Sequence, residues 1–144
     1  MTRNAALTSL SHDHHRELVH AHRLRKAAAG DAEARLAAAD AYVTSFFSET
    51  IEHFRREEEE LYPLYLRRAG ATPLLERILR EHMQLHGLAR ALRAEVAAGA
   101  AAAETLSSLG ELLHDHVRLE ERELFAEIER IVPDAELATM PLPH

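Results

Sequence analysis

Apolar residues recur at intervals of three and four along nearly the whole chain, and this spacing constrains the fold more than any other feature. It is the spacing of one face of an α-helix, whereas the strict alternation of half-buried strands is absent. Alanine, leucine, arginine and glutamate dominate and β-branched residues are few, which also favours helix. The sequence therefore predicts an all-α protein.

Helix start and stop signals divide this pattern into four segments. Ser9 or Ser11 is expected to cap the first segment, and Thr72 followed by Pro73 is a strong start signal for the third. Pro63 should kink or locally break the second segment near its end. The expected helices cover residues 9–29, 32–68, 73–98 and 102–132.

Long helices joined by short connections pack best as an up-down-up-down antiparallel four-helix bundle. We expect residues 1–132 to form this single domain, since a chain of 144 residues can bury a sizeable core. Residues 133–144 are polar and contain proline, so we expect them to form a loosely packed C-terminal tail.

Composition excludes several classes of function. The chain has no cysteine, so disulfides, thiolate metal sites and cysteine nucleophiles are ruled out. A net charge of −7 argues against nucleic acid as the main partner, because phosphate binding requires a basic face. No apolar run reaches the roughly 18 residues of a membrane span, and the N-terminus lacks the apolar stretch of a signal peptide. A cytoplasmic location is therefore expected.

Histidines and glutamates interrupt the apolar stripes at positions that face the core. His14 lies four residues after Leu10 and four before Leu18, and His53 lies seven after Phe46. Residues four apart stack on one side of a helix, so each such pair can reach a common centre. By this register the inward-facing polar residues are His14, His53, Glu57, His82, His86, His116 and Glu120.

Burying five imidazoles and two carboxylates is costly unless something pairs with them, and one or two metal dications would do so. Imidazole with carboxylate suits iron, zinc, copper or manganese better than calcium or magnesium. Two octahedral metals need about twelve coordination positions. Five imidazoles, two bridging glutamates and one bridging oxygen would fill all but one of these positions.

Four motifs occur in a fixed order: "DHH" (13–15), "HFRRE" (53–57), "EHMQLH" (81–86) and "HVRLE" (116–120). In this order they make the chain resemble a hemerythrin-like, or HHE cation-binding, domain over about residues 10–130. The resemblance implies a four-helix bundle with an oxo- or hydroxo-bridged non-haem di-iron centre, two iron ions that bind O2 or a related small molecule. It further implies that His82, His86 and His116 hold one iron, that His14 and His53 hold the other, and that Glu57 and Glu120 bridge both.

Two positions leave alternatives open. The well-known oxygen carriers place an aspartate five residues after the last histidine, whereas here Glu120 stands four residues after His116. Glu121 stands five after it and remains an alternative ligand. His15, the neighbour of His14, also remains an alternative, because it lies three residues before the core position Leu18.

Three functions are compatible with this ligand set. The first is reversible O2 binding by a carrier, store or sensor, which the nitrogen-rich ligands and the single open position favour. The second is a di-iron oxidoreductase that acts on peroxide or nitric oxide in stress defence. The third is a sensor in iron homeostasis. The sequence contains no nucleophile elbow, phosphate loop or dinucleotide fingerprint that would indicate another chemistry.

Overall fold

The computed structural model describes residues 3–141, which are helical nearly throughout and contain no strand. The first helical segment is α1 (Ala5–Ala28), and the third is α5 (Pro73–Ala97). The second runs through α2 (Ala32–Ser45), η1 (Phe46–Thr50), α3 (Ile51–Arg56), η2 (Glu57–Leu61) and α4 (Tyr62–Ala69). The fourth runs through α6 (Ala103–Leu119), η3 (Glu120–Leu124) and α7 (Phe125–Ile131) and is followed by the short α8 (Asp134–Leu137).

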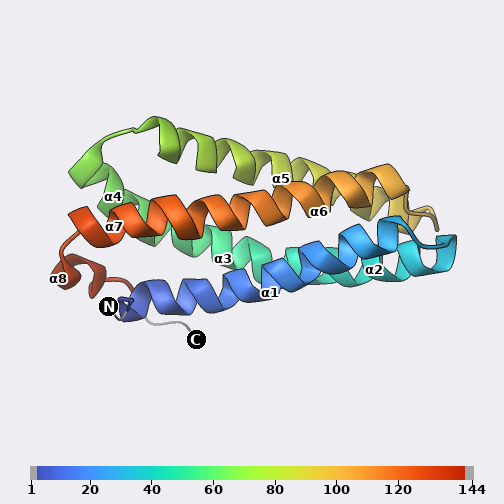
Figure 1. Ribbon diagram of the computed structural model, residues 1–144, viewed down its shortest axis with the longest axis horizontal. Helices are drawn as coiled ribbons and strands as arrows, with labels where there is room; N and C mark the ends of the chain where they lie inside the picture. The colour runs from blue at the N-terminus through green and yellow to red at the C-terminus, as the bar shows by residue number, and fades with distance from the viewer. Residues whose placement is uncertain (1–2, 142–144) are drawn as a thin grey trace.

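The long segments lie side by side along one axis and alternate in direction (Figure 1). Helix α1 packs against α2 and α6, and α5 packs against the same two helices. Each segment therefore contacts its neighbours in the chain, and the last closes against the first. This is the predicted all-α, up-down-up-down bundle.

The start of the first helix differs from the prediction. The helix begins at Ala5 rather than at residue 9, and its cap is Asn4, whose side-chain oxygen accepts a hydrogen bond from the Ala6 amide at 2.9 Å. Ser9 and Ser11 therefore lie inside the helix and cap nothing. Asparagine is as good a cap as serine, and the apolar Leu7 extends the buried stripe back to this point. The predicted start at Thr72 and Pro73 is confirmed, with Thr72 accepting from the Leu75 amide at 3.2 Å.

Two π-helical turns interrupt the second segment, and a third interrupts the fourth. The turn η2 ends two residues before Pro63, so the helix widens there and continues instead of breaking. Proline lacks the amide proton of the regular ladder, and a wider turn accommodates the loss. Glu57 is the first residue of η2 and Glu120 is the first residue of η3. Single π turns inside α-helices often mark functional sites.

The buried apolar residues form two clusters rather than one. One cluster centres on Tyr42, Phe46 and Leu92, and the other centres on Leu10, Ile78 and Phe125. A layer of buried histidine and glutamate side chains separates them along the bundle. The core is thus apolar at both ends and polar in the middle.

The C-terminal stretch is packed, in contrast to the loose tail that the sequence predicts. Leu137 is fully buried and Met140 nearly so, both against the second apolar cluster. The Asn4 side chain donates a hydrogen bond to Asp134, and α8 lies beside the start of α1 (Figure 1). Residues 142–144 lie outside the described part of the chain. Between residues 3 and 141, no helix is sufficiently long and apolar to cross a membrane.

Candidate metal centre

Six buried side chains from all four helical segments meet in the polar layer, and each is at most 3% exposed. Their possible ligand atoms fall into two groups, within which every pair of atoms lies within 4.8 Å. One group is His14, His53 and Glu57, and the other is His82, His116 and Glu120.

Glu57 lies between the two groups. Its Oε2 atom is 3.2 Å from Nε2 of His53 and 3.4 Å from Nε2 of His14. Its Oε1 atom faces the other way and is 3.4 Å from Nε2 of His82. The two oxygens of one carboxylate thus serve different groups, which is the arrangement a bridging ligand requires.

Glu120 occupies the corresponding position on the fourth segment. Its Oε2 atom is 3.3 Å from Nε2 of His116 and 3.5 Å from Nε2 of His14, so this oxygen also faces both groups. Its Oε1 atom accepts a hydrogen bond from the Tyr62 hydroxyl at 2.7 Å. That hydroxyl is also 3.4 Å from Nε2 of His82, so Tyr62 is a seventh side chain at the centre.

Most atoms that point into the layer have no hydrogen-bond partner among the described residues. They are Nε2 of His14, His53 and His116, both carboxylate oxygens of Glu57, and Oε2 of Glu120. Buried polar atoms are nearly always satisfied, because each one left alone costs about 1–3 kcal/mol. Nitrogen and oxygen lone pairs that converge in this way fit a bound cation.

The outer nitrogen of each of these four histidines is held by a carboxylate. The Nδ1 atom of His53 is 2.9 Å from Asp13, and that of His82 is 2.7 Å from Glu58. Because a carboxylate only accepts, Nδ1 donates, so the neutral form of each imidazole has its Nε2 lone pair available for a metal. The other two pairs are His116 with Glu81 at 2.8 Å and His14 with Glu121 at 2.7 Å.

These four acceptors, Asp13, Glu58, Glu81 and Glu121, form what we call the carboxylate belt. Each helical segment supplies one acceptor to the histidine of the next segment in the chain, and the last segment supplies Glu121 to His14 on the first. The belt therefore closes around the bundle. A carboxylate on the outer nitrogen of a metal-binding histidine fixes the tautomer and the direction of the imidazole and raises its basicity.

The belt and the inner glutamates also control the protonation of the metal-free centre. Burial lowers the pKa of the His53 imidazole, but the Glu57 and Asp13 carboxylates outweigh this effect and raise it to about 9. His116 behaves in the same way, because Glu120 and Glu81 raise its pKa to about 9 against the effect of burial. Burial raises the pKa of Glu57, yet His53 and the other groups around it hold that pKa well below its usual range. The layer thus stabilises positive charge, as a cation site should.

His86 lies outside both ligand groups. It is only half-buried, and its imidazole ring packs against Phe46 and Phe54, with centroids 5.3 Å and 5.6 Å apart. Burial lowers its pKa below the ordinary value, whereas the carboxylates around the four inner histidines outweigh burial and raise the pKa of each. Of the alternatives that the sequence leaves open, His15 is exposed, and Glu121 bonds the outer nitrogen of His14 rather than facing the layer.

Sequence reasoning missed Asp13, Glu58, Glu81 and Tyr62, all of which act across helices. A signal for the belt is nonetheless present. Each belt residue is the immediate chain neighbour of an inward residue, in the pairs Asp13–His14, Glu57–Glu58, Glu81–His82 and Glu120–Glu121. Neighbours on a helix are about 100° apart, so a carboxylate beside an inward ligand faces the adjacent helix.

The fold and this centre together define a four-helix bundle protein with buried histidine and glutamate groups that could hold metal. The family model described as Hemerythrin HHE cation binding domain matches residues 6–128. The chain belongs to this family, whose members bind metal cations. A comparison with curated proteins finds no match.

Proposed function

We propose that the protein is a non-haem di-iron protein that binds O2 or a related small molecule at the buried centre. The observation that carries the proposal is the set of unpaired Nε2 and carboxylate atoms between four histidines whose outer nitrogens are all fixed. Imidazole and carboxylate ligands together suit iron. The metal ligands would be His14, His53, Glu57, His82, His116 and Glu120.

Within this proposal the residues of the chain have separate roles. Glu57 and Glu120 would bridge, because their oxygens face histidines of both groups. The carboxylate belt orients the imidazoles, and the Tyr62 hydroxyl orients Glu120. The two apolar clusters shield the centre from water at its two ends along the bundle. When bound, the metal pair would supply positions for a small ligand and the capacity to change oxidation state.

Elemental analysis of protein purified without a metal-chelating tag tests the centre. Two iron ions per chain are expected, and a single zinc ion or no metal would overturn the proposal. Exposing the reduced, anaerobic protein to O2 then tests ligand binding. A change in the absorption spectrum that reverses when O2 is removed is the expected result, and an irreversible change would exclude reversible O2 binding.

A second candidate is a di-iron oxidoreductase that acts on peroxide or nitric oxide. The carboxylate belt favours it, because four carboxylates around a centre that already holds Glu57 and Glu120 stabilise a metal of higher charge. This candidate predicts turnover of peroxide or nitric oxide that exceeds the rate with free iron and is lost in Glu57→Gln. A rate equal to that of free iron would exclude it.

A further inference from the structure

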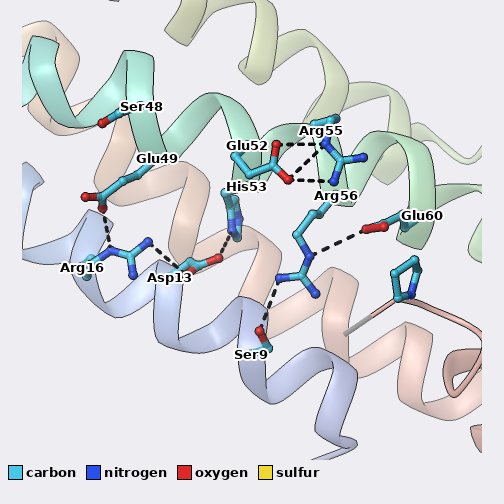
Figure 2. Close-up of a pocket in the computed structure, with 11 residues that line it drawn as sticks. Ser9, Asp13, Arg16, Ser48, Glu49, Glu52, His53, Arg55, Arg56 and Glu60 are labelled. Carbon is cyan, nitrogen blue, oxygen red and sulfur yellow. Dashed lines mark hydrogen bonds and ion pairs between the residues drawn. The ribbon is translucent and has the colours of Figure 1, made fainter. Parts of the chain in front are cut away.

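A cavity of about 400 Å³ opens beside the centre, between α1 and the second helical segment (Figure 2). Asp13 and His53, which form one hydrogen-bonded pair of the carboxylate belt, line the cavity. Pro141, from the C-terminal stretch of the chain, also lines it. One water molecule occupies about 30 Å³ in the liquid, so the space holds a small molecule with several waters. A molecule bound in this cavity would lie beside His53, a proposed metal ligand.

The charges that line this cavity are largely matched to one another. Arg16 contacts both Asp13, at 3.0 Å, and Glu49, at 3.1 Å. Arg55 bonds Glu52 at 2.7 Å. The lining includes three arginines and four carboxylates, so it concentrates neither anions nor cations strongly.

Arg56 and Glu60 differ from these matched pairs. Arg56 is only 7% exposed, and its Nη1 atom donates one long hydrogen bond to the Ser9 hydroxyl at 3.3 Å. Its Nε atom is 3.7 Å from Oε2 of Glu60, which is beyond hydrogen-bond distance. That oxygen is buried and accepts no hydrogen bond from the described residues. A guanidinium carries five N–H donors, so the cavity presents unfilled donors beside an unfilled acceptor.

We propose that this cavity binds a small neutral molecule that both donates and accepts hydrogen bonds. Such a molecule accepts from Arg56, donates to Glu60 and fits among matched charges that attract neither a free anion nor a free cation strongly. Of the ligands considered for the centre, hydrogen peroxide has this chemistry, whereas O2 and nitric oxide donate no hydrogen bond. The choice of peroxide rests on the proposed function; the binding site itself rests on the cavity.

The test uses the metal-free protein, in which peroxide is not consumed. Hydrogen peroxide is titrated into labelled protein while the N–H signals of the arginine side chains are followed by NMR. The Arg56 signal is assigned from its loss in Arg56→Lys. We expect it to shift and to saturate, and an unmoved signal, or shifts that grow linearly at every arginine, would overturn the proposal. Intact mass is checked afterwards so that methionine oxidation is not counted as binding.

Two variants sharpen the result. Glu60→Gln keeps the size of the side chain and removes its charge, so it should fold and weaken peroxide binding about tenfold, as expected for loss of a charged hydrogen bond. Arg118→Leu removes an exposed arginine of α6 outside the cavity and should leave the affinity unchanged. Equal affinity in wild type and Glu60→Gln would overturn the assignment of Glu60. If the protein binds peroxide but cannot be loaded with iron, the proposed function is refuted and this inference stands. If the protein loads with iron but peroxide does not bind at Arg56, this inference is refuted and the proposed function stands.

Discussion

Glu81 on α5 accepts a hydrogen bond from His116 on α6, with 2.8 Å between Oε1 and Nδ1. Both residues are buried, and the other oxygen of Glu81 is 3.3 Å from Nε of Arg77. The pair joins two helices at the level of the proposed metal and fixes which nitrogen of His116 faces inward. It is therefore the sharpest place to test the carboxylate belt.

Glu81→Gln should weaken metal binding by about 10- to 100-fold while the bundle remains folded, because the imidazole loses the carboxylate that orients it. Metal affinity is measured by competition with a chelator of known affinity. The matched control is Glu111→Gln, an exposed position on α6. Equal affinities for the two variants would show that the belt has only a structural role.

Glu57→Gln should lose most of the bound metal, because both oxygens of Glu57 face histidines and an amide is a poor bridging ligand. The neighbouring control is Glu59→Gln, whose exposed side chain lies 3.6 Å from Arg55. Metal content per chain by elemental analysis separates the two variants. Full metal retention in Glu57→Gln would remove Glu57 from the centre.

His86→Ala should retain its metal, whereas His116→Ala should lose it. His86 packs on Phe46 and Phe54 outside both ligand groups, so its loss should cost only about 1 kcal/mol of stability from aromatic packing. Metal content and urea unfolding are measured on both variants. If His86→Ala loses metal as completely as His116→Ala, then His86 does serve as a ligand, as the sequence pattern predicts.

Alkaline pH should unfold the protein through its buried tyrosines. Burial raises the pKa of Tyr42 well above the ordinary value of about 10, and the nearby Glu17 carboxylate adds to the effect. The folded state therefore keeps this proton more tightly than the unfolded chain does, so the stabilisation is complete below pH 10 and is lost as the pH rises further. Tyr65 has a raised pKa as well, and lysine contributes little because the chain contains only Lys26.

Tyr42→Phe tests this explanation. The Tyr42 hydroxyl is buried and makes no hydrogen bond to a described residue, so its removal should leave stability at pH 7 unchanged or raise it by about 1 kcal/mol. Thermal unfolding is measured at pH 7 and above pH 10. The stability lost between these two conditions should be smaller for the variant than for the wild type. A marked loss at pH 7 would mean that the hydroxyl has a partner.

Glycine-to-alanine changes at two helical positions should change the free energy of unfolding in opposite directions. A Cβ atom at Gly110 on α6 would lie 2.7 Å from Cγ of Arg25 and 3.0 Å from the backbone oxygen of Ala21, so Gly110→Ala should destabilise. A Cβ atom at Gly87 on α5 meets nothing within 4 Å, so Gly87→Ala should stabilise by up to about 1 kcal/mol through helix propensity. Urea unfolding measures both, and equal effects would contradict the close approach of α1 and α6.

The fold could be predicted from the sequence because the spacing of apolar residues, the caps and the short connections all agree. The π turns could not be predicted, since the spacing of apolar residues does not reveal the extra residue in each turn. His86 illustrates the limit. Spacing places His82 and His86 on one face of α5, but packing against the neighbouring helices puts His82 in a ligand group and the His86 ring against Phe46 and Phe54. The Phe54 ring contacts both histidines, with its centroid 3.9 Å from that of His82 and 5.6 Å from that of His86.

The belt pairs and the packed tail escaped prediction for a different reason. Which carboxylate meets which histidine depends on how each helix is rotated against its neighbour, and a single sequence does not contain that angle. Leu137 and Met140 are apolar residues three apart in a polar stretch, too few to show periodicity, yet both are buried. In both cases the deciding contacts come from segments far apart in the chain.

The closed carboxylate belt has a consequence for connectivity. Each helical segment is linked to the next through its own His–carboxylate pair, and the first is linked to the last in the same way, so these links run in parallel with the loops at Gly30, Gly70 and Gly99. The peptide connections are then partly redundant. Cutting one of these loops would leave all four links in place, so the two pieces should remain associated through the belt.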